Sequence, residues 1–232
     1  MPFTGFPPEA VKFLAQLERH NERPWFQANK DRYEALIRTP ALAFVEEMAE
    51  RLDDFAPHML ADPSPSGGSL MRIYRDTRFA GGKEPYKTNV GIQLRHERGE
   101  DAHAPSFYLH IDTKEFFVCC GIWKPAGPTL AAIRSRIAQF PQAWLAARDD
   151  RTFVKTWGKI WGERLKRPPR GFDADHPCIE DIKLKDFLGV LDLPRERMSS
   201  PKLLDTAAKA FAAGHSLMKF LCDALALPYG SS

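Results

Sequence analysis

The chain has 232 residues, of which 44% are hydrophobic and 27% are charged, as in an ordinary packed globular protein. This composition excludes a largely disordered chain, and the length favours one large domain, which we place at residues 1–232. The formal net charge of +3 is too small to indicate a nucleic-acid-binding protein by itself.

The first third of the chain has the periodicity of helices. One predicted helix has apolar residues spaced three or four apart, at Ala10, Phe13, Leu14 and Leu17. Pro24 fits the first turn of a second helix. Thr39 can cap a third helix, which should end near Pro57.

The middle third alternates apolar and polar residues, which predicts strands. The alternation is clearest at Val90, Ile92 and Leu94 and again at Phe107, Leu109 and Ile111, and it is weaker at Met71 and Ile73. A more continuously apolar strand spans residues 116–121, and the short link from Asp112 to Lys114 predicts a hairpin. One face of this sheet must be covered. The other would carry Arg72, Tyr74, Gln93, Arg95, Tyr108 and His110, either simply wet or lining a polar cleft.

The last third is again helical, with a long final helix predicted to begin at Ser200. We therefore predict an α+β fold, in which helices from the N- and C-terminal parts cover one face of an antiparallel sheet of about four to six strands. The longest apolar run, residues 116–123, is too short for a membrane helix, and we expect no membrane partner. The absence of a secretion-signal pattern and of CxxC spacing among the four cysteines favours a cytoplasmic protein with buried thiols.

Two short segments concentrate basic residues. Residues 70–99 contain seven Lys or Arg against three Asp or Glu, and residues 155–171 contain six against one. Arginine forks match carboxylate and phosphate oxygens, and nearby glycines let backbone N–H groups approach an anion. The candidate ligand-binding residues of the first segment are Arg72, Arg75, Asp76, Arg78, Lys83, Tyr86 and Lys87. Those of the second segment are Arg167, Arg170 and His176, in a loop stiffened by prolines.

Trp123 is a further candidate, because it could stack on a ligand ring, although we favour a place in the core. His110 and Asp112 share one strand face, but HExxH, paired CxxC and EF-hand patterns are absent, so we predict no metal site. The sequence indicates no cofactor and leaves open whether a reaction is catalysed.

These motifs resemble a known family, domain-of-unknown-function family 2461, whose members are usually labelled conserved hypothetical proteins. The resemblance covers about residues 6–220. It is sharpest at residues 75–79 with Lys83 and residues 85–87, and it continues at Gly121, Trp123 and Pro125 and at residues 167–172 with 176–177. Ala80 and Gly82 stand where the family commonly has a serine and an aspartate. The family implies no activity, cofactor or catalytic residue.

Our functional hypothesis is that the two basic segments converge on one pocket for a small phosphorylated or carboxylated ligand. One alternative is an interaction module that binds nucleic acid or an acidic protein through its basic surface. Another is an acid/base enzyme that uses Asp76 or His176. The plainest alternative is that the arginines form ion pairs that hold the sheet to the C-terminal segment. The sequence does not indicate an oligomeric state.

Overall fold

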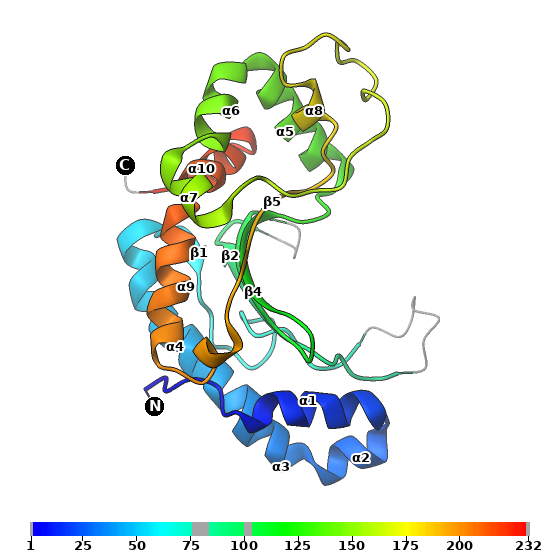
Figure 1. Cartoon of the computed structure of the whole chain (residues 1–232), viewed down its shortest axis with the longest axis vertical. Helices are drawn as coiled ribbons and strands as arrows, with labels where there is room; N and C mark the ends of the chain where they lie inside the picture. Colours follow the sequence, from blue (N-terminus) through cyan, green and yellow to red (C-terminus); the bar gives the residue numbers. More distant parts are fainter. Residues whose placement is uncertain (1, 76–83, 100–103, 231–232) are drawn as a thin grey trace.

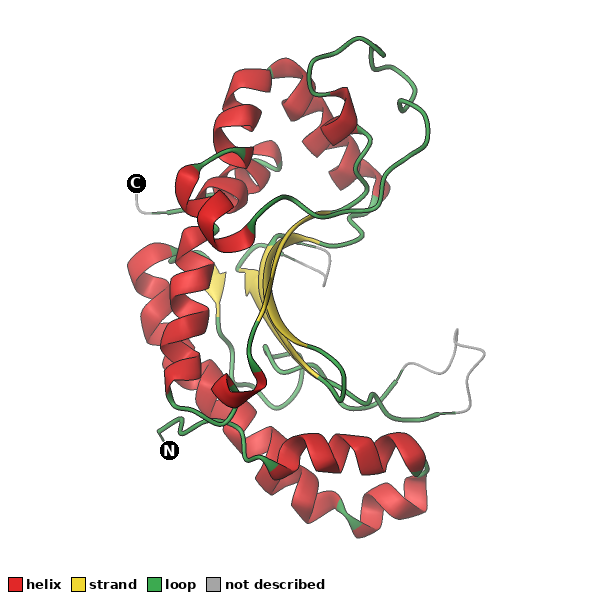
Figure 2. Cartoon of the chain, viewed as in Figure 1, coloured by secondary structure: helices red, strands yellow, loops and turns green. Residues whose placement is uncertain are grey.

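The computed structural model describes residues 2–75, 84–99 and 104–230 (Figure 1). The described residues form one five-stranded antiparallel sheet with helices from both ends of the sequence, which confirms the predicted α+β class (Figure 2). The strands lie side by side in the order in which they occur in the chain. They are β1 (Met59–Leu60), β2 (Val90–His96), β3 (Ser106–Ile111), β4 (Phe116–Ile122) and β5 (Phe187–Asp192).

Strand register follows the alternation of the sequence. Ile92 lies opposite Leu109, and Leu109 lies opposite Val118, so one row of buried side chains crosses three strands. This apolar face is covered by helices α4, α9 and α10 (Figure 1). The opposite face, which we call the open face, carries Tyr108 and His110, both half-buried. The sequence therefore predicted correctly which face is apolar.

The N-terminal helices are α1 (Glu9–Arg19), α2 (Arg23–Ala28), α3 (Lys30–Tyr33) and α4 (Thr39–Phe55). A five-residue π-helix, η1 (Glu34–Arg38), joins α3 to α4. Pro24 lies in the first turn of α2 and Pro40 in that of α4, as expected, since their missing N–H groups need no helical partner there. Short π-helical insertions are rare and often lie at functional sites.

Between β4 and β5 the chain makes a helical excursion through α5 (Gly127–Gln139), α6 (Pro141–Arg148), α7 (Arg151–Trp157) and α8 (Ile179–Ile182). After β5 come the short 3₁₀ helix η2 (Arg195–Arg197), α9 (Lys202–Ala213) and α10 (His215–Ala224). The single long final helix predicted from the sequence is thus broken at Gly214. Among the described residues, none of the helices is both long and apolar enough to cross a membrane.

Gly121 brings β4 and β5 together. Its φ is +125°, a left-handed conformation that favours glycine, and an added Cβ would lie 1.9 Å from the carbonyl oxygen of Phe187. The four cysteines are free and buried, as expected. Burial raises the pKa of the Cys119 thiol to about 12, so this thiol stays protonated at neutral pH.

Candidate anion-binding site at the base of the arm

The first basic segment lies on an arm that extends the sheet beyond β2. We define the arm as residues 70–75 and 84–89, which run antiparallel to each other. The amide of Lys87 donates to the carbonyl of Ile73 at 2.7 Å, and the amide of Arg75 donates to that of Pro85 at 2.9 Å. Met71 and Ile73, expected in a strand, therefore lie in an extended segment held by isolated bridges.

The arm is fixed to the N-terminal helices by Tyr86. Its ring is buried and stacks on Phe26 of α2, with centroids 4.2 Å apart. Just before α2, the side-chain amide of Asn21 donates to the carbonyl of Tyr86 at 3.0 Å, and its oxygen accepts the Tyr86 amide at 3.0 Å. Asn21 thus satisfies both backbone groups of one arm residue, as a neighbouring strand would. The Tyr86 ring is a packing element of the core.

A pocket of about 300 Å³ lies where the arm meets these helices. The helical side contributes Phe26, Lys30, Tyr33, Glu34, Arg38 and Leu42. The other side is formed by Ser64, Pro65 and residues 70–74. The volume is at the lower end of the range found for small-molecule sites. The π-helix η1 supplies Glu34 and Arg38 directly to the wall.

The pocket wall carries an excess of positive charge. Lys30, Arg38 and Arg72 face one acidic residue, Glu34, which pairs with Arg38 at 3.2 Å. Within the described part of the chain, neither Lys30 nor Arg72 forms an ion pair. Two cations are therefore available for an anion.

The surroundings of the pocket add to this polarity. Burial lowers the pKa of Lys87, and the positive charges of Arg72 and Arg75 lower it further, so three cations of the arm act on one another. Burial, assisted by the negative charge of Glu34, raises the pKa of Tyr33 to about 12. The Tyr33 hydroxyl thus stays protonated at neutral pH and can donate a hydrogen bond to an anion.

The structure brings part of the predicted first segment together. Arg72 lines the pocket, and Arg75 lies on the arm in an ion pair with Glu84 at 3.2 Å. The predicted residues Asp76, Arg78 and Lys83, with Ala80 and Gly82, lie outside the described residues.

The second basic segment lies elsewhere. Arg167 and Arg170 are exposed in the loop before α8, and the sheet lies between this loop and the arm along the long axis of the molecule (Figure 1). The expectation that the described parts of both segments line one pocket is therefore wrong. His176 bridges backbone groups: Nε2 lies 3.2 Å from the carbonyl oxygen of Ala138, and Nδ1 accepts the amide of Cys178 at 3.0 Å.

The position of Trp123 differs from the expected one, since we favoured a place for it in the core. Its side chain is 52% exposed, and the ammonium of Lys124 lies 4.7 Å from its ring centroid. The cause is the register of β4: Ile122 takes the last buried position, so the following side chain points outward.

Sequence reasoning missed Asn21, Lys30 and Arg38 as parts of the site. In the sequence, Lys30 and Arg38 look like ordinary solvent-exposed charges on predicted helices, and no sequence pattern connects them with Arg72. Asn21 stands in the short link between two helices, where asparagine is common in any protein. The family motif at residues 85–87 marked the arm, but it gave no sign of these helical partners.

Comparison with known proteins gives one match. The model of the family described as conserved hypothetical protein (DUF2461) matches residues 9–220. No curated protein and no solved structure matches the chain. Since the family model spans most of the 232 residues, the chain belongs to the DUF2461 family of conserved hypothetical proteins.

Proposed function

We propose that this protein binds a small phosphorylated or carboxylated ligand in the pocket at the base of the arm. The observation that carries the proposal is the pocket wall itself, where Lys30 and Arg72 have no acidic partner among the described residues. A phosphate or carboxylate group would supply the missing negative charge. Tyr33 would donate a hydrogen bond, and Phe26 and Leu42 would contact an apolar part of the ligand.

The arm makes the pocket wall rigid before a ligand arrives. Tyr86 is packed on Phe26, and its backbone is held by Asn21. Preorganisation of this kind reduces the entropy that binding costs. A preformed pocket of this size favours one small ligand. A long polyanion would need a row of cations along the surface instead.

The remaining predicted functions have less support. Asp76, one candidate for an acid/base role, lies outside the described residues, and the other, His176, has both ring nitrogens engaged by the backbone. The exposed Arg167 and Arg170 are better suited to a macromolecular partner than to a small ligand. The single-domain organisation and cytoplasmic location remain predictions.

The test is isothermal titration of the full chain with inorganic phosphate, a sugar phosphate, a nucleotide and a dicarboxylate. Arg72→Met and Lys30→Met each remove one charge and keep much of the apolar stem. Each should weaken binding roughly 10- to 100-fold, because a hydrogen bond to a charged group is worth about 1.5–3 kcal/mol.

Arg167→Met and Arg170→Met are the matched controls, since they remove the same charge from the distant loop. They should leave the affinity unchanged. Equal weakening by all four variants would show a bulk electrostatic effect and contradict the pocket. Binding of duplex DNA with a steep salt dependence, together with no small-ligand binding, would favour the interaction module instead.

A further inference from the structure

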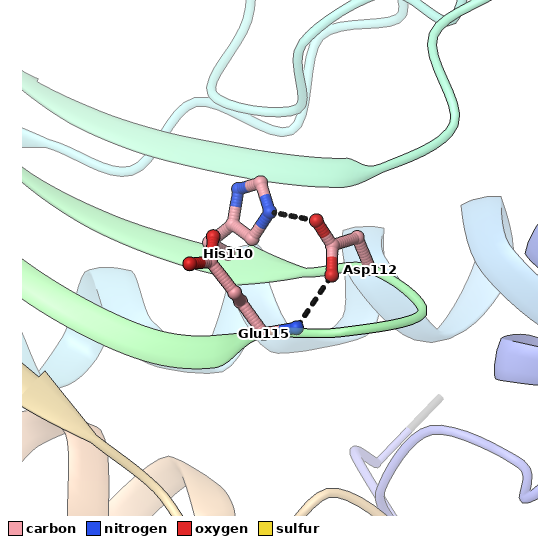
Figure 3. Close-up of side chains that lie close together, drawn as sticks. All are labelled: His110, Asp112 and Glu115. Atoms are coloured by element: carbon pink, nitrogen blue, oxygen red, sulfur yellow. Dashed lines mark hydrogen bonds and ion pairs between the residues drawn. The ribbon is translucent and has the colours of Figure 1, made fainter.

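Three ligand-type side chains meet on the β3–β4 hairpin, on the open face of the sheet (Figure 3). His110 and Asp112 lie two residues apart and so point to the same side, and Glu115 follows the turn. One nitrogen or oxygen atom of each residue lies within 4.8 Å of those of the other two. Nε2 of His110 is 3.0 Å from Oδ2 of Asp112.

The His110 ring is held in place from two sides. It stacks on Phe117 with centroids 4.8 Å apart and an interplanar angle of 10°, and its Nδ1 lies 3.1 Å from the Tyr108 hydroxyl. Gly91 leaves room for that hydroxyl, since a Cβ there would lie 2.7 Å from it. In the metal-free protein, Nε2 carries the hydrogen that it donates to Asp112. A metal ion would replace that hydrogen, and the tautomer with hydrogen on Nδ1 would then donate to Tyr108 and leave the lone pair of Nε2 for the ion. Metal-binding histidines are commonly oriented through such a bond from the second nitrogen.

The Asp112 carboxylate is also held in a fixed orientation. Its Oδ1 accepts the amides of Lys114 and Glu115, each at 2.6 Å, while Oδ2 is directed at His110. One carboxylate oxygen of Asp112 is therefore held by the backbone, and the other is left to bind.

The separation of the two best-placed atoms matches metal coordination. Nitrogen and oxygen ligands lie about 2.0–2.2 Å from Zn²⁺, so two ligands at right angles are about 2.9 Å apart and two at the tetrahedral angle about 3.4 Å apart. The observed 3.0 Å lies between these values. Glu115 is exposed, so its long side chain can swing toward the other two.

The charge around the hairpin favours a cation. Besides Asp112 and Glu115, the carboxylate of Glu18 accepts the Thr113 hydroxyl at 3.3 Å, and Asp192 lies opposite Phe117 in the next strand. The cations near the hairpin include Lys114, which is exposed, and Arg195, which donates to the main-chain carbonyl of Asp112 at 2.7 Å. The charged groups named here, all among the described residues, are thus four carboxylates and two cations.

We propose that His110, Asp112 and Glu115 bind one divalent transition-metal ion, of which Zn²⁺ is the best match to an imidazole and two carboxylates. Three protein ligands leave at least one coordination position open on the exposed side, as in sites where a metal holds water or a substrate oxygen. The sequence predicted no metal site because HExxH, paired CxxC and EF-hand patterns are absent, and only the hairpin brings Glu115 near His110. This proposal is independent of the anion pocket.

The experiment measures Zn²⁺ binding to the chelator-stripped full chain by equilibrium dialysis, and Co²⁺ binding by visible absorption. One ion per chain is expected, with Co²⁺ bands that His110→Ala abolishes. Asp112→Asn keeps an oxygen for the turn amides, so the hairpin is preserved, and it should weaken Zn²⁺ binding at least tenfold. Tyr108→Phe, which removes the partner of Nδ1, should weaken it about 10-fold. Mg²⁺, which prefers oxygen ligands, should compete poorly.

Asp62→Asn is the matched control, because the Asp62 carboxylate also accepts an amide two residues later, that of Ser64 at 2.8 Å. It should leave metal binding unchanged. The proposal is overturned if the wild-type chain binds no Zn²⁺, or if Asp62→Asn and Asp112→Asn bind it equally well. Far-ultraviolet circular dichroism on every variant separates loss of the site from loss of the fold.

Discussion

Asn21→Ala should loosen the arm more than a surface substitution of this size would. The variant removes two hydrogen bonds of 3.0 Å and leaves the N–H and C=O of Tyr86 without protein partners. At about 1 kcal/mol for each bond, the free energy of unfolding should fall by about 2 kcal/mol. For a chain of this length, that lowers the melting temperature by about 4–8 °C.

Asn21→Asp separates the two bonds. Its carboxylate still accepts the Tyr86 amide but has no donor for the Tyr86 carbonyl, so we expect about half of the loss. Asn29→Ala is the matched control, because the Asn29 amide makes only one backbone bond, to the carbonyl of Trp25 at 2.9 Å.

Amide hydrogen exchange measured by NMR gives the local readout. The Tyr86 amide should exchange faster in Asn21→Ala and remain protected in Asn29→Ala, because exchange reports local opening. The ligand of the arm pocket should also bind more weakly to Asn21→Ala, since a mobile wall must be ordered on binding. The reasoning is refuted if Asn21→Ala melts like the wild type, or if Tyr86 exchanges at an unchanged rate.

Two further predictions concern the sheet. Gly121→Ala combines a φ of +125° with a Cβ 1.9 Å from the Phe187 carbonyl oxygen, so it should lower the free energy of unfolding by more than the roughly 1–3 kcal/mol of backbone strain alone. Urea unfolding measures this loss. A loss below about 1 kcal/mol would contradict the register of β4 and β5. Asp112 has a lowered folded-state pKa, so its stabilisation is complete above the unfolded pKa of about 4 and is lost as the pH falls through the folded value. The stability difference between wild type and Asp112→Asn should therefore shrink between pH 5 and the acid limit of folding, and a pH-independent difference would be evidence against it.

Local patterns predicted the elements with strong periodicity. The alternation of Val90, Ile92 and Leu94 matched β2, and the short link after Asp112 matched the β3–β4 hairpin. The short β1 and the edge strand β5 were missed, because two residues carry no periodicity and because β5 follows a long helical excursion. The Trp123 expectation failed for a related reason: hydrophobicity favours burial, but the register at the end of β4 decides the direction of the side chain.

The candidate site was predicted only in part. Arg72, Arg75 and Lys87 were recognised because basic residues cluster in the sequence, and the structure places them on one arm. The residues that line the pocket together with Arg72 could not be predicted in the same way. Lys30 and Arg38 are distant in sequence, and their approach to Arg72 depends on how α2, α3 and η1 pack against the arm.

The sequence by itself determined the fold class, the apolar face of the sheet, the family and the identity of the basic segments. Each of these depends on local periodicity or on residues close together in the chain, where side-chain direction follows from the backbone geometry. The tertiary structure decided which charges share a pocket, that the second basic loop lies apart from the arm, and that His110 meets Asp112 and Glu115. Those relations depend on how elements that are distant in the sequence pack against each other. That packing is set by the combined burial of many residues, so no local pattern predicts it.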